Sequence, residues 1–140
     1  MSLAAKSEEV LDAIEFGIKF NQPLNNLPAG LKNLYLGWYF NQPLDNLPLG
    51  LTHLFLSTKF NHPLKNLPNS IIKLYLMGYL QSPANIQYQD FVYPKNLQSL
   101  TIYNSNISIK NLPSTLKNLS ITLSEQYYFK KLEEDSPLVF

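Results

Sequence analysis

Few residues in this sequence are suited to acid–base chemistry. Only two histidines, His53 and His62, could act as general acids or bases near neutral pH. His62 stands in "FNHPLKNLP", where two closely similar stretches carry glutamine, so we interpret it as a surface variant of a polar position. At the position of His53 the neighbouring repeats carry Asn33 and Lys73. A general base at His53 would therefore have no equivalent residue in the adjacent repeats to support its chemistry. We expect no catalytic residues and a protein that is not an enzyme.

Patterns that bind metals or cofactors are also missing. The absence of cysteine excludes disulfides, thiolate zinc sites and a cysteine nucleophile. Asp45, Asp90 and Asp135 are scattered, and the carboxylates of "KKLEEDS" lie beside lysines in a charge run typical of a solvated surface. Five glycines leave little room for a glycine-rich phosphate loop. We therefore expect no metal and no cofactor.

Composition restricts the class of protein further. With 140 residues, 45% of them hydrophobic and 15% charged, the chain suits one globular domain with a core of its own. A net charge of +1 does not favour nucleic acid or an acidic membrane surface as a partner. No apolar run approaches the roughly 18 to 20 residues that cross a bilayer, and the first residues do not resemble a signal peptide. We expect a cytoplasmic protein, in the host cytoplasm if it is viral.

One phrase recurs three times and predicts the architecture. "FNQPLNNLP" begins at Phe20, "FNQPLDNLP" at Phe40 and "FNHPLKNLP" at Phe60, a step of twenty residues. The phrase alternates with L-x-x-L-x-L segments such as "LKNLYL", in which Leu34 and Leu36 should point inward and Tyr35 outward because strand side chains alternate. Twenty residues with one short strand match the leucine-rich repeat. We predict a mainly β, leucine-rich-repeat-like solenoid with one parallel sheet of about six short strands and helix-poor return arcs.

The repeat also indicates the organisation of the chain. Equivalent apolar positions define six strand units, at residues 11–16, 31–36, 51–56, 71–76, 97–102 and 116–121. We expect an N-terminal flank or cap over 1–10, repeats over 11–123 and a C-terminal cap over 124–140. The 26 residues from Pro68 to Pro94 indicate a six-residue insertion near 86–91, and the 19 from Pro94 to Pro113 a one-residue deletion near "NSNISI".

The repeated asparagines predict structural hydrogen bonds. A return arc without a helix leaves backbone groups facing the interior, and asparagine offers both a donor and an acceptor to satisfy them. We expect two ladders along the stack. The first would contain Asn21, Asn41 and Asn61; the second would contain Asn26, Asn46, Asn66 and Asn111.

The outer face of the predicted sheet is the candidate binding surface. Aromatic residues recur on adjacent strands of this face, and such residues suit protein interfaces. The candidate protein-binding residues are Tyr35, Phe55, Tyr75, Trp38, His53, Lys73 and Tyr103. Aromatic residues are also good strand formers that stack on one another, so a purely structural role stays open. Carbohydrate or small-ligand binding and self-association as a homodimer are the functional alternatives.

The recurring phrase and its strand pattern resemble the FNIP repeat, a subclass of leucine-rich repeat abundant in amoebae and giant viruses. The resemblance covers about residues 11–121, with three phrases in register. It implies a right-handed solenoid that binds proteins and is often joined to an F-box, so a ubiquitin-ligase substrate adaptor is one implied function. Only ten residues precede Leu11, so an F-box would have to come from a longer chain or from a partner.

Overall fold

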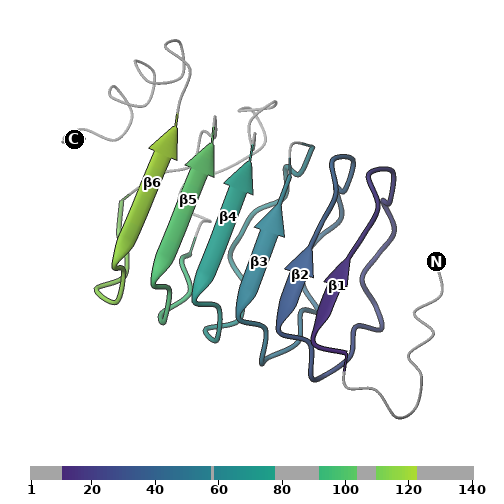
Figure 1. Ribbon diagram of the computed structural model, residues 1–140, viewed down its shortest axis with the longest axis horizontal. Helices are drawn as coiled ribbons and strands as arrows, with labels where there is room; N and C mark the ends of the chain where they lie inside the picture. The colour runs from purple at the N-terminus through teal and green to yellow at the C-terminus, as the bar shows by residue number, and fades with distance from the viewer. Residues whose placement is uncertain (1–10, 58, 78–91, 104–109, 123–140) are drawn as a thin grey trace.

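The computed structural model describes residues 11–57, 59–77, 92–103 and 110–122. These residues form one six-stranded sheet whose strands follow chain order from one edge to the other and pair in parallel throughout (Figure 1). The strands are β1 (Ala13–Glu15), β2 (Asn33–Tyr35), β3 (His53–Leu56), β4 (Lys73–Met77), β5 (Ser99–Tyr103) and β6 (Asn118–Thr122). No helix occurs within these ranges. The predicted mainly β solenoid with helix-poor return arcs is confirmed.

The strand register follows the repeat in the sequence. Leu34, Leu54 and Leu74 are direct neighbours across β2, β3 and β4, in steps of twenty residues. The next partners are Leu100 and Leu119, which lie 26 and 19 residues further along. The irregular spacing therefore changes the connections and preserves the register of the sheet. The predicted insertion near 86–91, the deletion near 104–109 and the two caps, 1–10 and 124–140, lie outside the described residues.

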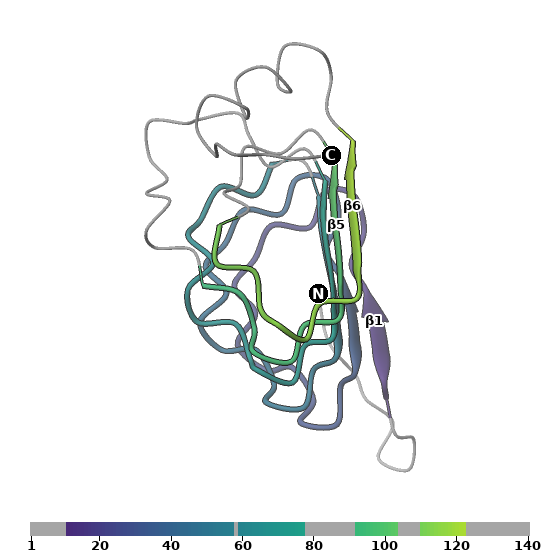
Figure 2. The same ribbon diagram turned by 90° about the vertical axis from the view of Figure 1, so that its left-hand side faces the viewer.

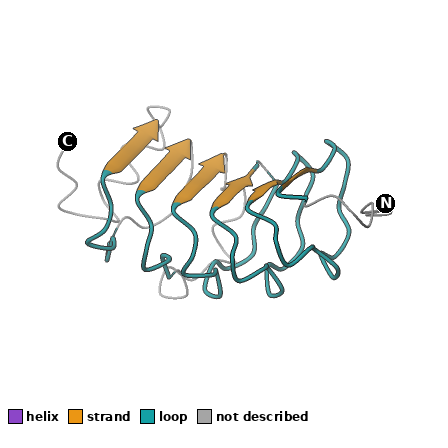
Figure 3. Cartoon of the chain, turned by 60° about the horizontal axis from the view of Figure 1, so that its bottom comes forward, coloured by secondary structure: helices purple, strands orange, loops and turns teal. Residues whose placement is uncertain are grey.

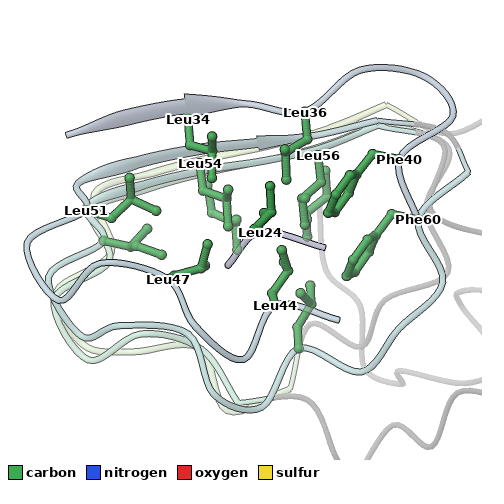
Figure 4. Packing of buried hydrophobic residues seen from close by; sticks show 14 of the residues in the cluster. Leu24, Leu34, Leu36, Phe40, Leu44, Leu47, Leu51, Leu54, Leu56 and Phe60 are labelled. Atoms are coloured by element: carbon green, nitrogen blue, oxygen red, sulfur yellow. The ribbon is translucent and has the colours of Figure 1, made fainter. Parts of the chain in front are cut away.

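The core lies between the sheet and the return arcs. Viewed along the stack, the strands form one side of each coil and irregular backbone closes the other (Figure 2). Figure 3 shows the strands side by side, with the loops on the other side of the molecule. Leu34 and Leu36 point inward, as predicted, and meet Leu44 and Leu47 from the arc (Figure 4). Their counterparts one coil further on repeat this arrangement, so the apolar interiors of successive coils merge into one core.

A proline turn precedes each strand from β2 to β6. The N–H of Leu31 donates to the carbonyl of Pro28 at 3.1 Å, and the same bond recurs before β3, β4, β5 and β6. Directly after the turn, the N–H groups of Lys32 and Asn33 both donate to the carbonyl of Asp12 in the previous coil, at 2.8 and 2.9 Å. This doubled bond also recurs at each later step. The coils are therefore hydrogen-bonded to one another before the sheet ladder begins.

A second turn follows the first three strands and brings neighbouring coils close together. The N–H of Phe40 donates to the carbonyl of Gly37 at 3.1 Å, and Phe20 makes the same bond to Gly17. A Cβ atom on Gly37 would lie 2.5 Å from the carbonyl oxygen of Gly17, closer than any real carbon–oxygen contact. Only glycine fits at Gly37, because the preceding coil occupies the space of a side chain.

The first asparagine row links successive coils. The N–H of Asn41 donates to Asn21 Oδ1 at 2.8 Å, and the N–H of Asn61 donates to Asn41 Oδ1 at 3.0 Å. Gln42 Nε2 lies 3.3 Å from the carbonyl oxygen of Asn21, and His62 Nε2 lies 3.1 Å from that of Asn41. His62 thus takes the place of a repeated glutamine. Since Asn41 and Asn61 are half-buried and Asn21 is exposed, this row lies toward the outside of the corner and does not face the interior.

The second expected ladder is corrected by the structure. Asn26, Asn46 and Asn66 are exposed, and within the described chain no hydrogen bond joins them. Asn111 is a turn residue with a φ of 58°, a left-handed conformation that asparagine tolerates well. Water can satisfy the exposed amides, so these positions need no partner in the next coil.

Hydroxyl groups and one further asparagine take over the role expected of that row. Thr52 Oγ1 donates to the carbonyl of Lys32 at 3.0 Å, and Ser70 Oγ donates to that of Leu51 at 2.6 Å. Asn69 Oδ1 accepts a bond from the N–H of Lys95 at 3.0 Å. A second set of polar links between coils therefore lies at the turns before β3, β4 and β5.

Candidate functional site

The outer face of the sheet carries one continuous row of side chains. Register places Tyr35, Phe55 and Tyr75 side by side on β2, β3 and β4. The rings of Tyr35 and Phe55 stack with centroids 4.3 Å apart and planes at 10°, and those of Phe55 and Tyr75 lie 5.8 Å apart at 34°. We call these three residues the aromatic strip. Glu15 precedes it on β1, and Thr101 and Ser120 continue the row on β5 and β6.

The aromatic strip is open to solvent on one side. The side chain of Tyr35 is 37% exposed, while Phe55 and Tyr75 are half-buried. Each ring covers part of its neighbour, which explains why these residues lose surface although no other element lies over them in the described chain. The strip therefore offers aromatic surface whose side chains are already held in place.

A basic row runs beside the aromatic strip. His53 and Lys73 are register partners on β3 and β4, two positions before Phe55 and Tyr75. His53 Nδ1 lies 2.8 Å from Thr52 Oγ1, and Lys32 Nζ lies 3.3 Å from the carbonyl oxygen of Gly50. Strands β2 to β5 contain no aspartate or glutamate, so this margin of the strip has no carboxylate to neutralise it.

The remaining two candidate residues lie apart from the strip. Tyr103 is at the end of β5 beside Met77, its register partner, and both are exposed. Trp38 is not on the sheet but in the turn that follows β2, and its side chain is 46% exposed. The seven candidate residues thus divide into five on β2–β4, one in a turn and one on β5.

A shallow hollow at the C-terminal ends of β1–β3 was not predicted from the sequence. It has a volume of about 430 Å³ and is lined by Glu15, Phe16, Gly17, Ile18, Gly37, Trp38 and Ser57. Two of its lining residues are glycines in equivalent positions of successive coils, and a Cβ atom on Gly17 would have no atom within 4 Å. The aligned glycines of "FGIKF" and "GWYF" were a signal that could have indicated it.

The described residues contain no constellation suited to metal chemistry. No group of three or more histidine, cysteine, aspartate or glutamate side chains comes close enough to hold an ion. In the same part of the chain, no helix has the length and apolar character needed to cross a membrane. What these residues offer instead is an ordered aromatic and basic surface.

Comparison with known proteins supports the repeat. Residues 20–59 match the family model described as FNIP Repeat, which spans the first two recurring phrases and strands β2 and β3. The chain has no significant match among curated proteins. The matched family is a repeat module generally associated with protein binding, and no catalytic family is indicated. Over residues 20–59 the chain is therefore similar to the FNIP repeat family.

Proposed function

We propose that this protein is a non-catalytic binding module that recognises another protein through the outer face of its sheet. The aromatic strip, Tyr35, Phe55 and Tyr75, supplies the centre of the contact, and the basic row supplies its margin. The stacked arrangement of the strip is the observation that carries this proposal. Aromatic side chains give large contact area at low entropic cost, and the cost falls further when neighbouring rings already hold them in place.

The basic row defines the chemistry of the partner. The side chain of Lys73 makes no hydrogen bond or ion pair with any described residue, and the adjacent strands carry no carboxylate. A partner that places apolar or aromatic groups over the strip and carboxylates beside Lys73 and His53 would be complementary in charge. A substrate-adaptor role, with a ubiquitin ligase recruited by another domain or protein, is compatible with this arrangement.

Replacement of the strip tests the proposal. The variant Tyr35→Thr, Phe55→Thr, Tyr75→Thr keeps strand propensity, and the row already carries threonine at Thr101. We expect the natural chain to bind its partner saturably, in a complex that can be purified. The variant should fold but should not bind this partner. The matched control is Leu49→Ser with Val92→Ser, which removes exposed apolar groups from outside the sheet. Equal capture by the strip variant would refute the assignment.

The same material separates the alternatives. Light scattering of the purified chain over a range of concentrations would show a dimer, and dissociation of that dimer in the strip variant would favour self-association. Saturable binding to a glycan array that disappears in the strip variant would favour a carbohydrate. Neither result would be compatible with a dedicated protein partner on this surface.

A further inference from the structure

We propose that the hollow at the C-terminal ends of β1–β3 binds a cationic side chain, arginine before lysine. This deepens the proposed function and rests on it for the expectation that a protein supplies the cation. The hollow combines an acidic group, an exposed indole and two glycines, and Phe16, Ile18 and Ser57 complete its lining. Together these features fit a planar cation better than an anion or a neutral apolar group.

The acidic group is Glu15, which lines the hollow from the exposed end of the outer row. Its side chain is exposed, and it forms no ion pair with any described residue. Asp12 and Glu15 are the only carboxylates on or directly before the strands of the sheet. The negative charge of this face is therefore concentrated beside β1, away from Lys73 on β4.

The indole belongs to Trp38, whose backbone is held on both sides. The Trp38 carbonyl accepts a bond from the N–H of Lys59 at 3.1 Å, and the next N–H, that of Tyr39, donates to the carbonyl of Ile18 at 3.1 Å. The turn that carries Trp38 is thus fixed to the coils before and after it. Tryptophan is the best aromatic partner for a cation, and a guanidinium group can also stack on its plane.

Two of the residues that line the hollow are glycines. Gly37 cannot carry a side chain because of its contact with the Gly17 carbonyl, whereas a Cβ atom on Gly17 would have no atom within 4 Å. The space beside Gly17 is therefore empty only because glycine has no side chain to fill it. The resulting shallow space, rimmed by Glu15 and Trp38, suits one side chain that enters from a partner lying along the sheet.

The arrangement also predicts how the partner is oriented. The basic row lies on β3 and β4, and the carboxylate of the hollow lies on β1. A bound segment would place its cation at the β1 end, its apolar groups over the aromatic strip and its carboxylates beside Lys73. Charge reversal along the face would disfavour the opposite orientation.

Trp38 makes the test direct, because it is the only tryptophan in the chain. Its fluorescence is titrated with N-acetyl-arginine amide, against the neutral N-acetyl-citrulline amide at matched ionic strength. We expect a saturable change with the arginine compound, with a dissociation constant on the order of 10 to 100 mM, and a weaker one with N-acetyl-lysine amide. No saturable change, or an equal change with citrulline, would overturn the proposal.

Two variants locate the binding. Glu15→Gln should weaken arginine binding by about threefold or more, whereas Asp12→Asn, a matched change outside the hollow, should leave it close to that of the natural chain. Gly17→Leu should abolish binding by filling the hollow while Trp38 is kept. Unchanged binding in either Glu15→Gln or Gly17→Leu would overturn the assignment.

This titration contains no macromolecular partner, so its outcome is independent of capture. Arginine binding without partner capture would refute the proposed function and leave a cation site. Partner capture that depends on the aromatic strip, without arginine binding, would refute the cation site alone.

Discussion

Two aromatic columns run along this molecule, one on each side of the sheet. The inner column contains Phe20, Phe40 and Phe60, whose rings lie nearly parallel at centroid distances of 6.2 and 6.3 Å. The outer column is the aromatic strip, in which the distances are 4.3 and 5.8 Å and the second pair is tilted by 34°. Both columns repeat every twenty residues with the same class of side chain, so periodicity alone does not separate scaffold from surface.

Burial does separate the two columns. Phe40 and Phe60 are each 1% exposed, because the corner phrase turns them into the interior where every coil must close. Tyr35 is 37% exposed, since the alternation of the strand turns it away from the same core. The inner rings therefore stabilise the stack, and the outer rings remain available to a partner. Substitutions at matched positions can test this division.

The largest effect is expected in the inner column. Phe40→Ala should lower the free energy of unfolding by about 3 to 5 kcal/mol, because it removes a fully buried ring between two stacked neighbours. Urea unfolding followed by circular dichroism would measure the change. A loss below about 1 kcal/mol would mean that the coils can collapse around the missing ring and that the inner column is not the scaffold.

A smaller effect is expected where neighbouring coils touch. Gly37→Ala should cost about 1 to 3 kcal/mol, because its Cβ atom would meet the Gly17 backbone at 2.5 Å. The turn of the next coil carries Ser57 at the equivalent position, and its closing bond to Phe60 is longer, 3.4 Å against 3.1 Å.

Gly17→Ala is the matched control for this glycine. Its Cβ atom would meet nothing within 4 Å, and its backbone lies outside the left-handed region. We expect no loss of stability and a gain of up to about 1 kcal/mol from a less flexible unfolded chain. Equal melting temperatures of the two variants would contradict the close approach of the first two coils.

The two asparagine rows give a third test. Asn41→Ala should cost about 1 kcal/mol, because the half-buried N–H of Asn61 loses its acceptor at 3.0 Å. Asn46→Ala lies in the same phrase but is exposed and unbonded, so its free energy of unfolding should change by less than about 0.5 kcal/mol. Thermal unfolding of the pair would measure the difference, and equal losses would show that both rows contribute alike.

The fold could be predicted from the sequence because its separate repeating features all indicate the same twenty-residue coil. The leucines of "LKNLYL", the proline before each strand and the corner phrase recur together, and a one-residue shift would expose Leu34 and bury Tyr35. The order of the strands and the outer row followed from that alignment. The same agreement made the aromatic strip visible before its geometry was known.

The site could be predicted only in part, for reasons of geometry between coils. Asn21 and Asn26 are the same residue type in the same phrase, and only the path of the arc decides which one reaches the next coil. The hollow beside Trp38 is open at Gly17, which has no side chain, and Gly37 lets the backbones of two coils approach closely, which cannot be deduced from spacing. A repeated side-chain pattern predicts which residues line up on adjacent strands, but it does not predict a hollow between two coils.

The smallest effect is expected in the outer column. Phe55→Thr should lower the free energy of unfolding by less than about 1 kcal/mol, because it removes only ring stacking with Tyr35 and Tyr75 on an open face. Threonine keeps strand propensity, and the ladder that pairs β3 with β2 and β4 is made by the backbone alone. The same urea experiment as for Phe40→Ala gives the value directly. A loss as large as that of Phe40→Ala would show that the outer rings hold the sheet together, and the aromatic strip would then be scaffold on both sides of the strand.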